Sequence, residues 1–385
     1  MRIYLDNAAT SWPKPASVYA AVDHYQRELG AAAGRGVYAE AIESERLVTS
    51  ARQRLARLIN AETPERIVFA FNGTDALNLA LHGLLQPGDH VVTTVAEHNS
   101  VLRPLRWLAD HKQVTITYVG CNKAGIVDPA EIEQAITPRT KLIAVIHASN
   151  VTGAIQPVAE IGLLAHGRGI KFLVDAAQSV GHLPIDVRSL HADLLAAPGH
   201  KGLLGPLGTG FLYLAPGMET LVEPTRQGGT GTRSDEDRQP TSLPDRYEAG
   251  NLNVPGLVGL EAGLAEIERR GVAAIQQHEA TLTSQLLTGL ADIPAWEVFG
   301  PADVRERVGV VSLRLPGSDP RELAAILDTS HQIQTRAGIH CAPRMHTSLG
   351  TSPEGTLRLS VGLFTTTAEI EQTLAALAEI ALELG

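Results

Sequence analysis

One lysine of this chain lies in a segment suited to covalent chemistry. Lys201 follows an apolar run and stands in Pro198-Gly199-His200-Lys201-Gly202, between two glycines. Glycine lets a backbone turn sharply and lets a flat ligand approach closely. A lysine partly removed from water favours its neutral amine, which can form an imine. A surface lysine in a turn would have the same neighbours, and the other five lysines occupy places typical of solvated side chains: Lys14, Lys112, Lys123, Lys141 and Lys171.

Asp175 is a second candidate, because it ends an apolar strand predicted over residues 171–174. A carboxylate at the carboxyl end of a parallel strand points into the crevice where α/β sheets bind ligands. There it could pair with a protonated pyridine nitrogen and keep an aromatic ring electron-poor. Capping a following helix is the simpler alternative for an isolated aspartate.

The turn Asn72-Gly73-Thr74-Asp75 joins a predicted strand to a predicted helix. Free N–H groups, the positive end of a helix dipole, a glycine and a hydroxyl donor together suit a phosphate. Other strand-to-helix turns look similar, so this pattern alone identifies nothing. His98 follows the next strand, where its ring could lie over a flat ligand or belong to the polar surface.

Cys341 lies in a loop that contains arginine, histidine, glycine and proline, Arg336-Ala337-Gly338-Ile339-His340-Cys341-Ala342-Pro343. Positive neighbours lower the pKa of a thiol and favour the nucleophilic thiolate. Cys121 has no such neighbours. His340, Cys341 and His346 could also suggest a metal site, but no second pair of ligands completes the set, and we expect no metal.

A rhythm of short apolar runs and helical patterns must position these residues. The sequence predicts a mainly parallel α/β sheet in a large domain over residues 21–253. A smaller α/β domain comprises residues 1–20 and 254–385 and carries the cysteine loop, whereas residues 223–253 show no periodicity and predict a functional loop. Strands are expected at 66–70, 90–94, 114–119, 142–147, 171–174, 193–197, 308–315 and 356–361, and helices at 74–85, 100–111, 129–136, 157–167, 320–327 and 367–384.

Composition limits the range of functions. The 385 residues are 44% hydrophobic and carry a formal net charge of −10, which argues against nucleic acid or an anionic membrane as the main partner. Only two cysteines occur, so no disulfide framework is expected. No apolar run reaches the length of a signal peptide or a transmembrane helix. A soluble cytoplasmic protein is the expectation.

Eight segments, taken in order, resemble the cysteine desulfurase and selenocysteine lyase branch of the class V aminotransferases. The resemblance covers nearly the whole chain and implies a pyridoxal 5'-phosphate enzyme of fold type I. The segments are Tyr4-Leu5-Asp6-Asn7-Ala8-Ala9-Thr10, Glu97-His98, Ser149-Asn150-Val151-Thr152-Gly153, Asp175-Ala176-Ala177-Gln178-Ser179, Gly199-His200-Lys201, Tyr247-Glu248-Ala249-Gly250, the cysteine loop, and Arg358-Leu359-Ser360.

The resemblance implies a role for each matching residue. Lys201 would carry the cofactor as a Schiff base and move the substrate Cα proton, and Cys341 would take the substrate sulfur as a persulfide. Asp175 would pair with the pyridine nitrogen. The other implied cofactor contacts are Gln178 at the phenolic oxygen, His98 stacked on the ring, and Gly73, Thr74, His200 and Asn251 at the phosphate; Arg358, Asn150, Asn7 and Ala8 would bind the substrate.

Two residues depart from the family pattern. Pro198 replaces the usual phosphate-binding serine before Gly199-His200-Lys201, and proline has no N–H donor. Asn251 stands where the family has a threonine that reaches the phosphate of a neighbouring subunit. The stretch 342–357 between the cysteine and the arginine is short. A short loop limits the reach of the cysteine, so a dedicated sulfur-acceptor protein is expected.

The resemblance favours a homodimeric enzyme acting on L-cysteine or L-selenocysteine. An aminotransferase, epimerase or β-lyase, in which Cys341 takes no part, uses the same cofactor and stays open. A non-catalytic protein of the same fold that binds a partner is a further alternative. A dinucleotide-binding dehydrogenase shares the α/β rhythm, but the chain has no G-x-G-x-x-G after its first strand.

Overall fold

The computed structural model describes residues 2–232 and 235–384. Its larger sheet has the strand order β2-β8-β7-β6-β5-β3-β4, and only β8 is antiparallel to its neighbours β2 and β7. The predicted α/β class with a mainly parallel sheet is confirmed. The strands are β2 (Ile67–Ala70), β3 (His90–Thr94), β4 (Thr115–Val119), β5 (Thr140–Ile146), β6 (Lys171–Asp175), β7 (Leu194–Pro198) and β8 (Gly210–Leu214).

Both faces of this sheet are buried, which explains why its strands are apolar throughout. Successive side chains of a strand point to opposite faces. Leu194 therefore belongs to the core beneath α3 and α4, and Leu195 belongs to the core on the α2 side. The helices between the strands are α3 (Gly73–Leu84), α4 (Asn99–Lys112), α5 (Pro129–Gln134) and α6 (Val158–Gly167), and α2 (Ala39–Leu58) precedes β2.

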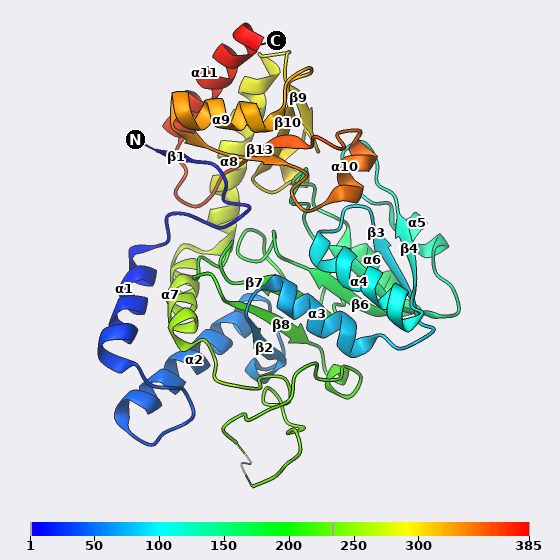
Figure 1. The fold of residues 1–385 in the computed structure, drawn as a ribbon, viewed down its shortest axis with the longest axis vertical. Coiled ribbons are helices and arrows are strands. Elements are labelled where there is room, and N and C mark those ends of the chain that lie inside the picture. The colour runs from blue at the N-terminus through cyan, green and yellow to red at the C-terminus, as the bar shows by residue number, and fades with distance from the viewer. Residues whose placement is uncertain (1, 233–234, 385) are drawn as a thin grey trace.

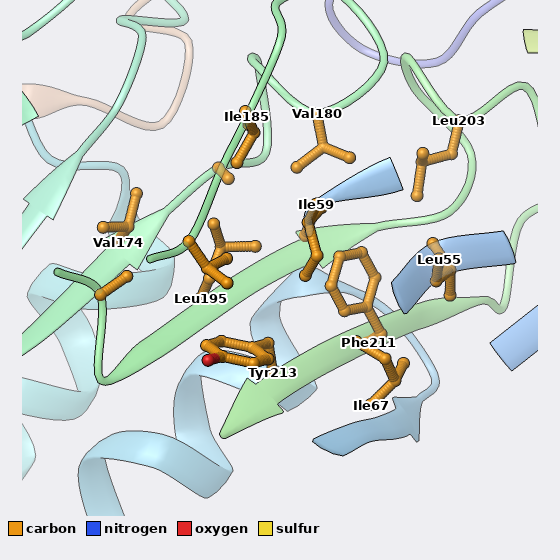
Figure 2. Close-up of a cluster of buried hydrophobic side chains, with 14 of the residues drawn as sticks. Leu55, Ile59, Ile67, Val174, Val180, Ile185, Leu195, Leu203, Phe211 and Tyr213 are labelled. Carbon is orange, nitrogen blue, oxygen red and sulfur yellow. The ribbon is translucent and has the colours of Figure 1, made fainter. Parts of the chain in front are cut away.

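The core on the α2 side is built from long-range contacts. Leu55 lies near the end of α2, and Ile59 follows that helix. Figure 2 shows both side chains beside Phe211 of β8, with Tyr213 on the same strand. All four are almost fully buried, so they fix α2 against β8, the strand that follows the Lys201 loop.

A second, four-stranded antiparallel sheet has the order β12-β13-β10-β9. Its core also takes in β1 and β11, which pair in parallel and bring the N-terminal strand to this part of the molecule (Figure 1). The strands are β1 (Ile3–Tyr4), β9 (Glu297–Phe299), β10 (Val310–Arg314), β11 (Ile333–Gln334), β12 (Arg336–Gly338) and β13 (Thr356–Ser360), and the helices are α8 (Val272–Ala291), α9 (Pro320–His331), α10 (Pro343–Leu349) and α11 (Thr367–Leu384).

The division into residues 21–253 and 1–20 plus 254–385 stays a proposal. Helix α7 (Val254–Arg270) packs against α1 (Ala16–His24) and α2. Its buried side chains, among them Leu257 and Leu260, join the core of the seven-stranded sheet. The chain therefore enters the smaller lobe through α8, which directly follows α7.

The segment 223–253 contains no helix or strand among its described residues. It lies at the end of the molecule opposite α11 (Figure 1). Its carboxyl end is anchored by Glu248, whose carboxylate accepts two hydrogen bonds of 2.8 Å from Arg52 and one of 2.6 Å from the N–H of Phe69. No described helix combines the length and the apolar character needed to cross a membrane.

Candidate active site

One cavity lies at the carboxyl ends of the strands of the larger sheet and has a volume of about 210 Å³. Asp175 ends β6, Lys201 follows β7, and Gly73 begins α3. Ligands of open α/β sheets bind at this edge. Ten of the residues predicted from the sequence line the cavity together: Ala8, Gly73, Thr74, His98, Asn150, Asp175, Gln178, His200, Lys201 and Arg358.

Lys201 has the electrostatic environment of a reactive amine. Withdrawal from water lowers its pKa to about 8; the Asp175 carboxylate opposes this shift, while Arg358 and Arg336 add to it. Burial disfavours an ammonium ion, so a substantial fraction of the amine is neutral near physiological pH. The backbone is held in place by Ser11, whose hydroxyl donates to the carbonyl of Lys201 at 2.9 Å.

Lys14 was expected to be a solvated lysine, and this expectation is wrong. Its ammonium donates to the hydroxyl of Ser11 at 2.7 Å and to the carbonyl of His200 at 2.8 Å. Burial lowers its pKa to about 8 as well. Lys14 does not line the cavity. It therefore supports the backbone that carries Lys201, from a position 187 residues earlier in the chain.

Asp175 is 3% exposed, and burial raises the pKa of its carboxyl group, against a hydrogen bond from Ala177 and the charge of Lys201. Residues 176–179 form turns rather than a helix, so the helix-cap alternative does not hold. The amide of Gln178, three residues on, donates to the carbonyl of Ala8 at 2.9 Å and thereby ties the N-terminal segment to this wall of the cavity.

The first residues of α3 also line the cavity. Asn72 caps the helix by accepting a hydrogen bond of 2.9 Å from the N–H of Asp75. The Thr74 hydroxyl lies 2.7 Å from the hydroxyl of Ser100. A Cβ at Gly73 would lie 3.1 Å from Cδ of Pro198, so these two segments pack closely and a larger residue would have to displace the proline slightly.

His98 is held as a neutral ring. Its Nδ1 accepts a hydrogen bond of 3.0 Å from the N–H of Ser100. Burial lowers its pKa to about 4, helped by the charges of Lys201 and Arg336. An uncharged imidazole is suited to stacking on an aromatic ligand. The neutral ring adds no positive charge to the cavity.

Arg358 of β13 is 1% exposed and reaches the cavity from the smaller lobe. Its guanidinium donates to Asp6 at 2.7 Å and to the carbonyl of Asn150 at 3.0 Å, and its Nε has no partner. The amide of Asn150 donates to the carbonyl of His340 at 2.7 Å, and its Oδ1 has no partner. Unpartnered buried polar atoms are costly, so these atoms indicate a polar ligand.

Cys341 lines an adjoining, larger cavity of about 460 Å³, which shares Thr74 and His98 with the cavity of Lys201 and also includes Arg103. His340 and Cys341 both adopt left-handed backbone conformations, with φ of 44° and 59°. Such conformations cost non-glycine residues energy and are found at functional sites. The carbonyl of Cys341 accepts a hydrogen bond of 2.7 Å from the N–H of Asn99, beside His98.

Arg336 was quoted with the cysteine loop but was not predicted as a site residue. It lines the cavity from β12, where it pairs with Arg358 of β13 across the sheet. Its Nη2 lies 3.9 Å from Sγ of Cys341. The spacing of five residues between Arg336 and Cys341 was the signal in the sequence, and the turn between them brings the guanidinium back to the thiol.

Two predicted residues lie elsewhere in this chain. Asn251 lines a separate cavity formed in part by the segment 223–253, and its expected role toward a neighbouring subunit stays a prediction. Asn7 borders a small adjoining cavity, and its amide group is occupied by the carbonyls of Ser360 and Tyr4 and the N–H of Trp12. Among the described residues no group of three or more His, Cys, Asp or Glu side chains could hold a metal ion.

The cavity combines a buried lysine, an aspartate at a strand end, a helix N-terminus and an arginine from the second lobe. This combination is typical of one family of transferases. The chain belongs to the class V aminotransferase family, whose family model, Aminotransferase class-V, matches residues 3–373. The family and the fold expected from the sequence are therefore confirmed.

Several similar proteins are cysteine desulfurases. A probable cysteine desulfurase of Methanothermobacter thermautotrophicus is 39% identical over 98% of this chain and 94% of its own length. A cysteine desulfurase of Dickeya dadantii is 34% identical over 99% of this chain and 92% of its own. The solved structure of a cysteine desulfurase from Thermococcus onnurineus matches with a TM-score of 0.93 at 37% identity, covering 100% of this chain and 95% of that one.

Glu97, beside His98, is fully buried, and burial raises its pKa to about 8 against hydrogen bonds from Thr94 at 2.7 Å and Ile146 at 3.0 Å. Both bonds reach one oxygen, and Oε2 has no partner. An acid with a raised pKa stabilises the folded state below its unfolded pKa and loses this contribution as the pH rises through its folded pKa. The stability that the protonated Glu97 contributes is therefore lost as the pH rises from about 5 to about 8.

The variant Glu97→Gln is expected to be more stable than the parent at pH 8, on the order of a few kcal/mol, and close to it at pH 5. Glutamine keeps the acceptor for both hydrogen bonds and never ionises. Urea unfolding of the two proteins at pH 5, 6.5 and 8 measures the difference. A difference that stays constant over this range would show that Glu97 is already ionised in the folded protein.

Proposed function

We propose that this chain is a pyridoxal-phosphate-dependent cysteine desulfurase that converts L-cysteine to L-alanine and holds the sulfur as a persulfide on Cys341. The observation that carries the proposal is the position of Cys341. Its thiol lies 3.9 Å from Arg336, a residue that lines the same cavity as Lys201, Asp175 and Arg358. The relatives named cysteine desulfurase support it.

The residues of the cavity fit pyridoxal phosphate. Asp175 offers a carboxylate for the pyridine nitrogen, and the start of α3 with Thr74 offers donors for the phosphate. His200 has a buried Nδ1 without a partner, which is a further donor for the phosphate. Lys201 would hold the cofactor through its amine. When bound, the cofactor supplies an electron sink for negative charge at the substrate Cα.

Pro198 lines the cavity but offers no donor to the phosphate. Its ring packs against Gly73 and therefore closes the cavity by contact alone. The phosphate would then depend on Thr74, His200 and backbone N–H groups of α3. Asn251 of a second subunit is the remaining donor in this proposal, because the Asn251 of the same chain lies outside the cavity.

Arg358 and Asn150 would bind and orient the substrate. A guanidinium matches the geometry of a carboxylate, and the unpartnered Nε of Arg358 is available for it. The hydrogen bond to Asp6 holds the Arg358 side chain in one orientation before the substrate arrives. Fixing the carboxylate between these residues presents the substrate Cα to Lys201, the one lysine that lines the cavity among the described residues.

Lys201 would then take the Cα proton, because its pKa of about 8 leaves a neutral amine while its conjugate acid can still return the proton. Sulfur transfer follows at Cys341. The Cys341 thiolate attacks the substrate sulfur, so that a sulfur–sulfur bond forms and the Cβ–S bond breaks. The bonding electron pair stays with the carbon fragment, which is protonated and leaves as alanine. Arg336 places a positive charge 3.9 Å from the sulfur that makes this attack.

Mass spectrometry of the intact holoenzyme after addition of L-cysteine tests this function. The expected result is alanine in the solution and a mass increase of one sulfur atom that peptide mapping places on Cys341. Cys121, the other free thiol, serves as an internal control and should carry no added sulfur. Alanine formation without sulfur on Cys341, or no alanine at all, contradicts the proposal.

The finer assignments follow from the same proposal. L-selenocysteine would be accepted at the same site, because its selenium occupies the place of the sulfur. The enzyme would act as a homodimer in the cytoplasm and pass its sulfur to an acceptor protein, without nucleic acid or a membrane as a partner. The cytoplasm fits the two free cysteines.

A further inference from the structure

A buried ion pair joins the two lobes next to the Lys201 loop. His182 lies in the turn that follows β6, four residues after Gln178. Its Nδ1 lies 2.9 and 3.0 Å from the two carboxylate oxygens of Glu279. Glu279 belongs to α8, and its side chain is 5% exposed. Leu282 and Leu286 of the same helix pack into the core of the smaller lobe.

The His182 ring also contacts the backbone next to Lys201. A Cβ added to Gly202 would lie 2.7 Å from both Cδ2 and Nε2 of His182 and would collide with the carbonyl of Val180. A Cβ on Gly181 would collide in turn with the carbonyl of Gly202. The turn 180–182 and Gly202 are therefore in direct contact, and the imidazole occupies the space that a side chain at position 202 would need.

The pair lines two further cavities, one of which shares residues with the active-site cavity. A cavity of about 380 Å³ is lined by His182 and Glu279, together with residues of α8 and of the segment 304–309. A smaller cavity is lined by the same two side chains and also by Ala8 and Gln178, which line the active site. Movement of the pair would therefore reach both Gly202 and Gln178.

Charge favours the ionised form of the pair. Burial lowers the pKa of His182, but the charge and hydrogen bonds of Glu279 outweigh it, so the pKa is raised; Lys201 opposes the increase. A His with a raised pKa contributes stability below its unfolded pKa and loses it as the pH rises through the folded pKa. The charged and titratable groups that face His182 are Glu279, Lys201, Arg305 and Arg307.

We infer that His182 and Glu279 are positioning residues for Lys201: the ring of His182 supports Gly202, and its bond to Glu279 fixes that support to α8 of the smaller lobe. In the ionised pair His182 is a cation near the Lys201 amine. The charge of Lys201 acts on His182 in turn, so the protonation of the two groups is coupled. The inference rests on the proposed role of Lys201 in proton transfer.

The variant Glu279→Gln tests the inference, with Glu261→Gln as the matched control. Glu261 is also a partly buried carboxylate in an ion pair, but it binds Arg54 across the contact between α2 and α7. In the holoenzyme, Glu279→Gln should lower kcat about tenfold or more and leave KM within twofold, because misplacing the proton-transferring group affects the chemical step more than binding. The control should keep both values.

A second readout uses the cofactor-free protein and requires no desulfuration. The pH dependence of acetylation of Lys201, followed by mass spectrometry with the exposed Lys123 as internal reference, reports the pKa of the Lys201 amine. In Glu279→Gln the buried His182 should lose its proton, as the NMR signals of its ring nitrogens would show. The midpoint of Lys201 acetylation should then differ from that of the parent, because the support of Gly202 beside the Lys201 amine is altered.

The inference is overturned if His182 loses its proton in Glu279→Gln while kcat and the acetylation midpoint stay at the parent values. If the variant does not fold, the parent protein decides: the acetylation curve of Lys201 should show a second inflection at the pH at which His182 titrates, and a single smooth curve overturns the inference. A parent enzyme that forms no alanine but shifts its Lys201 midpoint on Glu279→Gln would contradict the proposed function alone.

Discussion

Alanine in place of Cys341 is expected to lower kcat for L-cysteine by about 10³-fold or more, because the variant has no thiolate to attack the substrate sulfur. Cofactor content should be unchanged, since Cys341 borders the larger cavity and does not line the one that contains Lys201. Alanine formation under steady-state conditions and the visible absorbance of the purified protein measure the two quantities.

The matched control is Cys121→Ser, which removes the other thiol. Cys121 packs against Met345, with 3.8 Å between the two sulfur atoms, and lies outside both cavities. This control should keep full activity. Activity within tenfold of the parent in Cys341→Ala would remove the nucleophile from the proposal and favour a β-lyase. Activity of the variant toward L-selenocysteine alone would not, because selenide leaves carbon more easily than sulfide.

The variant Lys201→Ala is expected to lose covalent attachment of the cofactor and to lower kcat by about 10³-fold or more, because both the attaching amine and the proton carrier at the substrate Cα are removed. Borohydride reduction followed by intact mass measurement tests the attachment: the parent should gain one cofactor mass on Lys201, and the variant none. An added primary amine should restore part of the activity, because it replaces the missing proton carrier.

Lys14→Ala tests whether the cofactor attaches to Lys201 alone. Lys14 also has a pKa of about 8, but it lies outside the cavity. The reduced Lys14→Ala protein should still carry the cofactor on Lys201. Cofactor bound covalently at Lys14, or at any lysine in Lys201→Ala, would contradict the assignment. The exposed Lys123 provides the second control, and Lys123→Ala should keep the parent's activity.

The strands of the larger sheet could be predicted because burial on both faces makes each strand a continuous apolar run between turns. The run that ends at Asp175 was expected over 171–174, and β6 covers Lys171–Asp175. Strand β8 (Gly210–Leu214) was not predicted as a strand, nor was its antiparallel direction, which depends on its pairing with β2 and β7. An apolar run does not specify its partner. The antiparallel order of the smaller sheet was not predicted for the same reason.

The candidate site was predictable where residues follow parallel strands, because the carboxyl ends of those strands meet at one edge. Asp175 and Lys201 share the cavity for this reason. The sequence did not predict a place at the site for Lys14, Arg336 or His182. Each of them reaches the site through a contact with a residue in another element or beyond a turn. Lys14 illustrates the difficulty, because its local sequence resembles that of a solvated lysine, whereas its bond to the distant carbonyl of His200 appears only in the folded chain.

If the proposed function holds, the placement of Cys341 and Lys201 in adjoining cavities would divide the catalytic cycle into two compartments. Carbon chemistry would belong to the smaller cavity, and the cysteine that receives the sulfur would belong to the larger one, with Arg103 and Trp107 on its walls. An acceptor would then take the sulfur from the larger cavity without entering the smaller one. Unloading would leave the carbon chemistry undisturbed, and the rate of each half of the cycle would change through residues that the other half does not use.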